Sequence, residues 1–396
     1  MPEQILQVNE EAIKSQLGEL VRKTVEETLN ELLEKEADEL LNAARYERSV
    51  ERAGYRAGHY ERGLTTSSGQ IALKMPKLKG ATFETAIIER YRRRESSVEE
   101  AIVEMYLAGV SVRRVEDITE ALWGAKVSAS TVSSLNQKAY ENIEKWRSQP
   151  IEGEYPYVYV DGIWLKRSWG GEVGNVSVLV AVGVDIHGYR AVLGACEGMR
   201  ESAEDWRSFF LWLRDRGLKG VQLVIGDKRS GLGDAAQEVF GCKYQRCMVH
   251  FFRNVLNDVP KAKREAVSLM LKAIYAQESK EAARKKAAGV VQELHSMKLA
   301  KAAMCLQNGL EETLVFYSFP PKHWRLVRTT NMLERVNKEI RRRTRVVGAF
   351  PDGNSALMLV CARLRYVAGS QWGIKRYMSM QSLYEPGEAL AGNKAS

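Results

Sequence analysis

The sequence predicts an α/β fold built on a mixed sheet, and three observations carry this prediction. Apolar, β-branched runs at residues 157–160, 175–184 and 189–195 predict three successive strands joined by short turns. The residues 202–216 have apolar side chains at helical spacing, and a fourth apolar run follows at 221–225. Strands joined by short turns are antiparallel and a helical crossover adds a parallel strand, so the expected order is β-β-β-α-β.

Length and composition place the chain among ordinary globular proteins. Its 396 residues predict two or three domains, and 45% of them are hydrophobic and 28% charged. No apolar run approaches the roughly 18 residues that a transmembrane helix needs. The first residues are polar and acidic, unlike a secretory signal, so we expect a cytoplasmic protein with no membrane partner.

Basic residues gather in two short clusters. The formal net charge is +9, and local basic patches are the usual footprint of proteins that contact phosphate backbones. A solvated helix face is the simpler interpretation of either cluster alone. The clusters are Arg90, Arg92, Arg93 and Arg94, and Arg341, Arg342, Arg343 and Arg345.

The cysteines predict neither a disulfide framework nor a zinc ribbon. There are five, an odd number, they are scattered, and no two are separated by two residues. Reduced thiols are expected. They are Cys196, Cys242, Cys247, Cys305 and Cys361.

Before the α/β block, the pattern alternates between helical and irregular. Apolar residues at helical spacing predict a helix or helix pair over 11–44, for which a packing or dimerising role is the preferred interpretation. Residues 45–69 are rich in Gly, Tyr and Arg without a period and predict an irregular segment, whose Arg and Tyr residues would suit phosphate contact and base stacking. A short strand is expected at 70–76.

Residues 96–146 predict helices with a turn between them. One helix ends at Gly124, and the next is capped by Ser128, with Val132 and Leu135 on its buried side. Helix, short glycine-containing turn and helix is the plan of the helix-turn-helix motif. Spacing alone leaves DNA binding and simple packing as equal alternatives.

After the α/β block, helices dominate again. Residues 249–315 are Lys- and Ala-rich with no strand signal, 316–324 predict an irregular segment around a Pro-Pro pair, and 331–343 predict a strong helix. The Gly-, Ala- and Pro-rich tail from residue 385 is expected to be disordered.

Two aspartates are the first candidates for chemistry. Asp161 follows the first predicted strand and Asp227 the fourth, and in a β-β-β-α-β sheet these two strands are neighbours. For one such aspartate a turn-capping role is the simpler interpretation. Two carboxylates held close together repel unless a cation lies between them, and hard oxygen ligands suit Mg²⁺ or Mn²⁺. Phosphodiester cleavage uses two such ions about 4 Å apart.

Glu334 is the third candidate, at the start of the helix over 331–343. Its position near the helix N-terminus suits an anion, and Lys338 and Arg341 follow on the same face as possible phosphate anchors. Glu339 is the competing acid and points about 140° away. A surface helix with ordinary ion pairs is the alternative, so helix position alone does not decide between the two glutamates.

The motif RCMVHFFRN contains Cys247 and His250 at a spacing seen in zinc sites. No second such pair lies nearby, and a single pair is a weak zinc signal. A packing or bracing role beside the active site is therefore preferred to a zinc role. Arg253 in the same motif is a plausible DNA contact.

Together these motifs resemble the Mutator-like family of bacterial insertion-sequence transposases. The resemblance extends from the N-terminal helix to about residue 383, and the order and spacing of its motifs make it specific. The matching segments are YRAGHYERGL, GQIALKMPK, YPYVYVDGIWLK, GDKRSGL, YQRCMVHFFRN and HWRLVRTTNMLERVNKEIRRRTRVVGAFP.

The resemblance implies a ribonuclease H-like catalytic domain with a DDE triad of Asp161, Asp227 and Glu334. The 334 − 227 = 107 residues between the last two acids would contain an all-helical insertion. It also implies recognition of terminal inverted repeats, strand transfer into target DNA, two Mg²⁺ or Mn²⁺ ions, and a homodimer or higher assembly in bacterial cytoplasm, associated with the nucleoid in use. One departure is that Lys228, Arg229 and Ser230 follow the second aspartate where the family often has Ala-His.

The motifs and the resemblance together predict six regions in the chain. The regions are an N-terminal helical and irregular DNA-end-binding region (1–75), a helix-turn-helix-like DNA-binding region (76–150), the first part of the catalytic domain (151–248), the helical insertion (249–320), the second part with the Glu helix (321–384) and a disordered tail (385–396). Expected DNA contacts are Arg92, Arg93, Arg253, Arg328, Lys338, Arg341 and Arg345. Expected bracing residues are Cys247, His250, Trp324 and Asn331.

Two other classes of protein remain as alternatives. One is a non-catalytic DNA-binding protein derived from such an element, against which the three intact acids argue. The other is a structure-specific nuclease with the same fold, which would hydrolyse DNA without joining it.

Overall fold

The computed structural model describes residues 10–89, 92–107, 110–169, 172–198, 202–228, 231–347, 350 and 352–384. The chain divides into two compact units, residues 1–139 and 140–396. Some residues named in the sequence predictions lie outside the described residues, and those predictions stay untested. They are Arg90, Arg229, Ser230 and the tail from residue 385.

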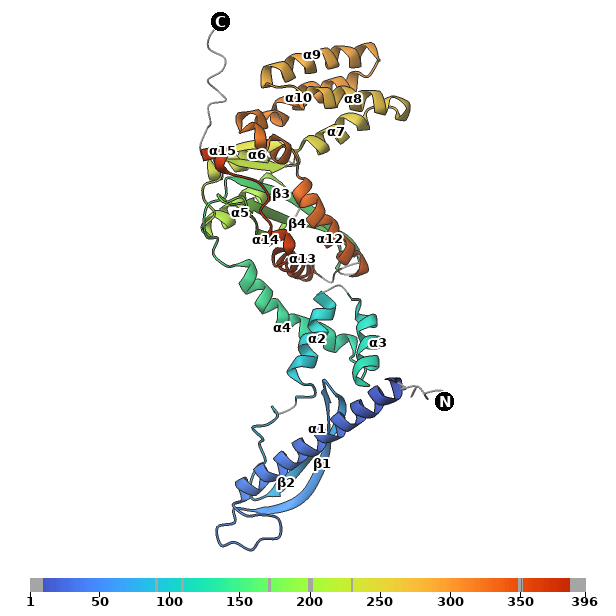
Figure 1. Ribbon diagram of the computed structural model, residues 1–396, viewed down its shortest axis with the longest axis vertical. Helices are drawn as coiled ribbons and strands as arrows, with labels where there is room; N and C mark the ends of the chain where they lie inside the picture. Colours follow the sequence, from blue (N-terminus) through green and yellow to red (C-terminus); the bar gives the residue numbers. More distant parts are fainter. Residues whose placement is uncertain are drawn as a thin grey trace, which may run out of the picture. The chain divides into compact units, whose positions relative to one another are not determined.

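The first unit begins with a long helix packed on a β-hairpin. Helix α1 (Glu10–Leu41) lies against β2 (Gly69–Lys79), which pairs in antiparallel fashion with β1 (Tyr55–Thr66). Figure 1 shows the blue helix lying along the two strands. The buried contact is apolar and consists of Leu33, Leu64, Ile71, Leu73, Met75 and Ile88.

The hairpin corrects the prediction that residues 45–69 are irregular. Its second strand alternates between buried and exposed residues, and this period of two is the signal that predicted a strand at 70–76. In β1 only the residues Leu64, Thr65 and Thr66 are fully buried, and the rest is exposed or partly exposed. A strand that is exposed to solvent along most of its length needs no alternation of apolar and polar residues. The polar residues and glycines of β1 therefore gave no strand signal in the sequence.

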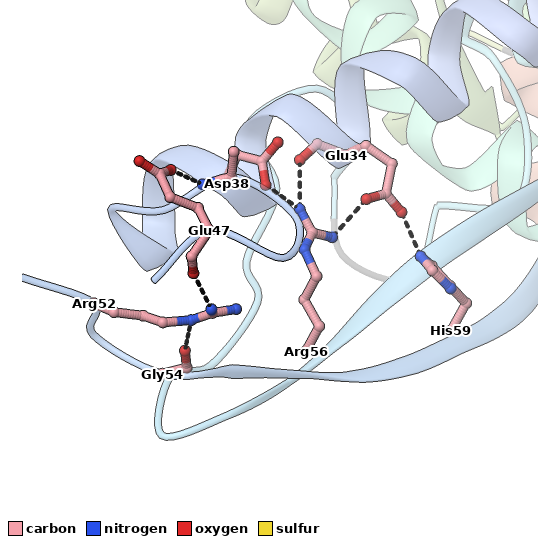
Figure 2. A network of polar contacts seen from close by, with 8 residues as sticks. Glu34, Asp38, Glu47, Arg52, Gly54, Arg56 and His59 are labelled. Atoms are coloured by element: carbon pink, nitrogen blue, oxygen red, sulfur yellow. Dashed lines mark hydrogen bonds and ion pairs between the residues drawn. The ribbon is translucent and has the colours of Figure 1, made fainter. Parts of the chain in front are cut away.

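An arginine joins the hairpin to the helix. Arg56 on β1 contacts the carboxylates of Glu34, at 2.5 Å, and Asp38, both on α1, and its side chain is only 14% exposed. His59 reaches the second oxygen of Glu34, so one glutamate is shared by two residues of the strand (Figure 2). Figure 2 also shows Arg52 bonded to the backbone oxygens of Glu47 and Gly54 in the preceding loop.

Three helices follow the hairpin, in agreement with the prediction for 96–146. They are α2 (Ser96–Leu107), α3 (Val112–Trp123) and α4 (Ala129–Arg147). Gly124 ends α3 in the left-handed conformation at φ 67°, and Ser128 accepts a hydrogen bond from Thr131 N as α4 begins. Val132 and Leu135 are buried in the apolar cluster of these helices, as expected.

The second unit contains a five-stranded mixed sheet in the order β5-β4-β3-β6-β7. Strands β3, β4 and β5 are antiparallel, whereas β6 and β7 run parallel to β3 and to each other. The first and fourth predicted strands are therefore neighbours, as expected. The strands are β3 (Tyr157–Trp169), β4 (Glu172–Val184), β5 (Arg190–Gly198), β6 (Leu223–Gly226) and β7 (Lys243–Arg246).

The end of the first strand, at Asp161, differs from the predicted one. The prediction that the first strand stops before Asp161 is wrong, because β3 continues to Trp169 and pairs with β4 along its whole length. Asp and Gly are poor strand formers, so the sequence signal broke at Asp161-Gly162. The prediction also missed β7 and the helix α6 (Leu232–Phe240), which are short and, in β7, polar.

One face of the sheet is covered by α5 (Ala203–Asp215) and α6. A capping box formed by Ser202 and Asp205 starts α5, and its aromatic side packs on the strands. Trp206, Phe209 and Phe210 are essentially inaccessible to solvent and contact one another. Burial of such rings supplies the largest apolar contribution to this layer.

Helices occupy residues 248–327, and α7 to α10 pack on one another in a cluster (Figure 1). The prediction of helices over 249–315 is confirmed, whereas 316–324 is not simply irregular. Pro321 sits in the first turn of a helix, a position that tolerates proline. The elements are α7 (Met248–Asn257), η1 (Lys261–Lys263), α8 (Arg264–Ile274), α9 (Lys280–Ser296), α10 (Ala300–Thr313), η2 (Val315–Ser318) and α11 (Pro321–Val327).

The chain then returns to the sheet. Helix α12 (Asn331–Val347) contains the predicted helix and contacts β3, and α13 (Gly353–Ala368) packs on β5 and on α12. Two short helices, α14 (Gln371–Ile374) and α15 (Gln381–Tyr384), complete the described chain. Within the described residues, no helix has the length and apolar character required to cross a membrane.

We predict that Arg56→Met destabilises the first unit by about 1–2 kcal/mol. Hydrogen bonds to charged groups contribute about 1.5–3 kcal/mol, and this value is discounted because the Glu34 and Asp38 side chains are 32% and 35% exposed. Urea unfolding measures the change. Lys23→Met, which removes an exposed pair with Glu27, is the control and should change the stability by less than about 0.5 kcal/mol. Equal effects of the two variants would contradict this role of Arg56.

We also predict that unfolding of the second unit depends on pH through His323. This buried imidazole bonds Tyr157 Oη at 2.8 Å and Ser379 O at 2.7 Å, and burial lowers its pKa below 6.5 despite the bond to Ser379. Below about pH 6.5 the unfolded chain therefore binds a proton that the folded chain does not. The free energy of unfolding should fall as pH decreases from 6.5 towards the lowered pKa. His323→Gln should remove this part of the slope, and an unchanged slope would refute the assignment.

Candidate active site

Asp161 lies where β3 leaves its parallel neighbour. The pairing of β3 with β6 ends at Tyr159 and Ile225, and continuing that register by two residues places Asp227 opposite Asp161. The Asp161 carboxylate accepts hydrogen bonds at both oxygens. Gly162 N donates to Oδ1 at 2.9 Å, and Asn337 Nδ2 on α12 donates to Oδ2 at 2.7 Å.

Asp227 follows the end of β6 and is held by its neighbours in the backbone. Lys228 N donates to its Oδ1 at 2.7 Å, and Tyr244 Oη on the adjacent β7 donates to its carbonyl oxygen at 2.9 Å. Cys247 N donates to Gly226 O at 2.7 Å. The strand end carrying this aspartate is therefore anchored on its β7 side.

The surroundings of Asp161 raise the pKa of its carboxyl group. Burial is the largest cause, and the negative charge of Asp227 adds to the increase. His250, the Gly162 N–H and Arg341 act in the opposite direction, but the pKa remains raised. Asp161 is thus a partly buried carboxylate whose charge the protein compensates incompletely, and an added cation would stabilise that charge.

Glu334 lies in the first turn of α12, facing α7. Its Oε1 is 3.8 Å from His250 Nε2 and 3.7 Å from Arg253 Nη2, both on α7. Among the described residues this buried oxygen has no hydrogen-bond partner. Asn337, which bonds Asp161, is three residues further on and therefore on the same face of α12 as Glu334.

The competing acid, Glu339, has a structural environment. Its carboxylate lies within 3.1 Å of Arg342 and of Arg363, and within 3.8 Å of Arg343. The Arg363 side chain, on α13, is only 4% exposed. A carboxylate that neutralises a buried arginine holds two helices together, so Glu339 has a packing role, whereas Glu334 contacts His250 and Arg253 on α7.

Cys247 connects the two halves of this arrangement. Thr330, just before α12, donates from N at 3.4 Å and from Oγ1 at 3.3 Å to the Cys247 sulfur. Burial raises the pKa of Cys247, but hydrogen bonds from His250 and Thr330 outweigh it and leave the pKa lowered. The bond to Cys247 likewise raises the pKa of His250 against the effect of burial. Cys247 and His250 thus contact the elements that carry Asp227 and Glu334.

The two other expected bracing residues have different surroundings. Trp324 donates from Nε1 to Phe319 O at 2.7 Å and packs edge-on against Phe316 and Tyr317. Among the described residues, none of these contacts of Trp324 involves one of the three carboxylates. Asn331 is exposed at the start of α12. The geometry therefore places Cys247 and His250 beside the acids, and Trp324 in an aromatic cluster.

Comparison with known proteins identifies the family of the chain. A family model described as "Transposase, Mutator family" matches residues 2–372, nearly the whole chain. The chain belongs to the Mutator family of transposases.

Similarity to individual members of the Mutator family extends over most of both chains. The sequence is 37% identical over 344 residues to the transposase for insertion sequence element ISRM5 of Rhizobium meliloti, covering 87% of this chain and 86% of the relative. It is 35% identical over 325 residues to the transposase for IS256 in transposon Tn4001 of Staphylococcus aureus, covering 81% and 83%. It is 34% identical over 351 residues to the transposase for IS1081 of Mycobacterium tuberculosis, covering 88% and 84%.

The basic residues expected to contact DNA in this Mutator-family chain fall into three groups. Arg253, Lys338, Arg341 and Arg345 are exposed or largely exposed on α7 and α12. Arg328 is half-buried, donates to Tyr275 O at 3.2 Å and has a pKa lowered by burial. In the first unit, Arg93 is exposed, whereas Arg92 bonds Arg94 O and Ser96.

Sequence reasoning missed a charged group around Asp227. Glu312 on α10 lies 3.0 Å from Lys228 Nζ and 3.6 Å from Arg246 Nη1. Arg246 is 5% exposed and its guanidinium lies over the Phe251 ring. This network joins the helical cluster to the residue after Asp227. The acid is 84 positions from Lys228, so only the fold reveals the pair.

The three acids do not form a closed ligand cluster. Among the described residues, no group of three or more His, Cys, Asp or Glu side chains is gathered tightly enough to hold a metal ion. The arrangement nevertheless offers hard oxygen donors of the type that Mg²⁺ and Mn²⁺ prefer, and two buried oxygens, Glu334 Oε1 and Asn337 Oδ1, accept no hydrogen bond among the described residues. The chemistry of these oxygen donors fits a divalent ion.

All five cysteines are free thiols, as the sequence predicted. Burial raises the pKa of Cys196 and Cys361 to about 12 and that of Cys242 to about 11. Cys247 is the exception, because of its hydrogen bonds to His250 and Thr330.

We predict that Cys247 and Thr330 are energetically coupled. Cys247→Ala would leave the buried Thr330 hydroxyl without an acceptor, which costs about 1–3 kcal/mol. In Thr330→Val that hydroxyl is absent, so the same cysteine substitution should cost less. A double-mutant cycle in urea unfolding measures the difference. Strictly additive effects would contradict the contact.

Proposed function

We propose that the chain is a DDE transposase that cleaves and joins DNA strands with two divalent metal ions held by Asp161, Asp227 and Glu334. The observation that carries the proposal is the convergence of three chain segments. Asp161 lies on β3 and Asp227 directly follows the parallel β6, at the position that continues the register of the two strands, and α12, which carries Glu334, binds Asp161 through Asn337. Membership of the Mutator family of transposases supports the reaction class.

The proposed catalytic fold is ribonuclease H-like. The chain order β3-β4-β5-α5-β6, with three antiparallel strands and a parallel fourth, supports this assignment. Helices α7 to α10 separate Asp227 from Glu334 and support an all-helical insertion between the two parts of the catalytic domain.

Each acid has a defined task in this proposal. Asp161, Asp227 and Glu334 would together hold the ions through their carboxylate oxygens. A divalent ion bound there would activate a water or the 3′-hydroxyl of a DNA strand as the nucleophile and would stabilise the leaving oxygen. Gly162 N and Asn337 orient the Asp161 carboxylate, and Lys228 N orients Asp227. No covalent protein nucleophile is required.

The exposed cations would position the DNA. Arg253 and Arg341 flank the carboxylates, with Arg253 near Glu334 and Arg341 near enough to Asp161 to lower its pKa. Lys338 and Arg345 are further exposed cations on α12, and the half-buried Arg328 would contribute to the same region. We propose that these side chains contact phosphates of the cleaved strand.

End recognition is proposed for the first unit. Helices α3 and α4 form a helix-turn-helix arrangement, with Ser130, Ser133 and Gln137 exposed on the second helix. Arg92 and Arg93 add positive charge to the same unit. The proposed DNA partners are the terminal inverted repeats and a target duplex. A homodimer or higher assembly would hold two ends together in the bacterial cytoplasm, at the nucleoid.

The test is cleavage and joining of DNA carrying the element ends by purified full-length protein with Mg²⁺ or Mn²⁺. Asp161→Asn, Asp227→Asn and Glu334→Gln should each lower the rate at least about 100-fold, because loss of a residue that merely supports a metal ligand already costs 10–100-fold. Each variant should still shift end DNA in a gel, because the proposed binding residues are intact.

Glu339→Gln is the matched control, since it makes the same chemical change on the same helix. It should keep the rate within a few-fold while lowering stability, because Arg363 loses its carboxylate partner. Full activity in all three acid variants would refute the triad. DNA binding without metal-dependent cleavage by the wild-type protein would favour a non-catalytic protein, and cleavage without joined product would favour a nuclease.

A further inference from the structure

The side-chain amide of Asn337 is buried, and its NH₂ group makes a hydrogen bond whereas its oxygen makes none among the described residues. Its residue is only 1% exposed, and its Nδ2 donates to Asp161 Oδ2 at 2.7 Å. Its Oδ1 is buried and has no hydrogen-bond partner in the part of the chain that the structure describes. A buried polar atom without a partner is costly, so most such atoms in folded proteins are satisfied by protein or by ordered water.

The orientation of the amide follows from the chemistry of its neighbour. An ionised carboxylate accepts hydrogen bonds and donates none, so the NH₂ group must face Asp161. The amide oxygen then necessarily points away from Asp161. Asn337 and Glu334 are one helical turn apart on α12, and Glu334 Oε1 has only the longer contacts to His250 and Arg253, with no hydrogen bond among the described residues. The Asn337 amide oxygen is thus the polar atom of this helix face that has neither a hydrogen bond nor an ion pair in the described chain.

We propose that Asn337 is a positioning residue of the metal site, which fixes the Asp161 carboxylate through Nδ2 and accepts a hydrogen bond from a metal-bound water at Oδ1. This inference rests on the proposed function. Carboxylates that bind metals are themselves hydrogen-bonded, which sets their orientation. Mg²⁺ and Mn²⁺ sites of this type usually retain several water ligands, and such a water is a strong donor.

A structural role alone would make a different prediction. If the Asn337–Asp161 bond only joined α12 to β3, its loss would lower stability and leave the intrinsic affinity for the metal unchanged. If it positions the carboxylate, its loss weakens metal binding even where the fold is retained. Asn337→Leu has nearly the same shape as asparagine and removes both polar groups, so it separates the two possibilities.

The experiment is a titration of the full-length protein with Mn²⁺, following the free aqueous ion by electron paramagnetic resonance. The affinity of Asn337→Leu should be about 10–100-fold lower than that of the wild type. Its Mn²⁺-induced rise in melting temperature should shrink in parallel, because a ligand stabilises only in proportion to its binding. The concentration of Mn²⁺ that gives half-maximal DNA cleavage should increase, with a smaller change at saturating metal.

Thr344→Val is the matched control, because it removes a buried hydroxyl from the same helix that bonds only Arg341 O, at 3.4 Å. It should leave Mn²⁺ affinity unchanged. If wild-type binding is abolished by Asp161→Asn but is unaffected by Asn337→Leu, the inference is wrong and the proposed function stands. If the wild type binds no Mn²⁺, or binds it equally well without Asp161, the metal site fails and the role of Asn337 fails with it.

Discussion

The burial of one carboxylate is the constraint around which the second unit is arranged. Asp161 lies on the central strand of the sheet, where removal from water makes its charge expensive. A second carboxylate, Asp227, is placed at the adjacent strand end, which increases the cost. The packing of an ordinary sheet requires no pair of acids at this position. Their presence is the physical basis of the proposed cation site.

The rest of the unit can be understood as support for that position. Helix α12 is held at its start by the contact of Thr330 with Cys247, in its middle by Asn337 on Asp161, and further on by Glu339 on the buried Arg363. These three contacts reach α7, β3 and α13 respectively. They restrain both the rotation and the axial position of the helix, with Glu334 directed towards α7 and Glu339 towards α13.

The sequence was sufficient for those parts of the site that depend on regular local patterns. Asp161 and Asp227 could be paired because short turns and a helical crossover dictate which strands are neighbours, and the structure has that order. The choice between Glu334 and Glu339 could not be made from periodicity. The residue that gives Glu339 a packing role, Arg363, is 24 positions beyond Glu339 and belongs to another helix. The contact of Asn337 with Asp161 could not be predicted from the sequence either. A single asparagine indicates no role until it is known which face of its helix packs on the sheet.

The failures in the first unit have a different physical origin. Strand β1 is exposed along most of its length, so it lacks the alternation that buried strands require. It is held instead by pairing with β2 and by Arg56, whose partners are 18 and 22 residues away on α1. Long-range pairs of this kind leave no signal in a short sequence window, and the glycine-rich, polar composition without a period predicted an irregular segment instead.

The most direct measurement of the central claim is a crystal structure of the full chain with Mn²⁺ and DNA carrying the element end, with the metal located by anomalous scattering. The account predicts two peaks about 4 Å apart, one contacting Asp161 and Asp227 and the other Asp161 and Glu334. Glu339 should remain on Arg363. Manganese bound away from Asp161, or held by Glu339 in place of Glu334, would contradict it.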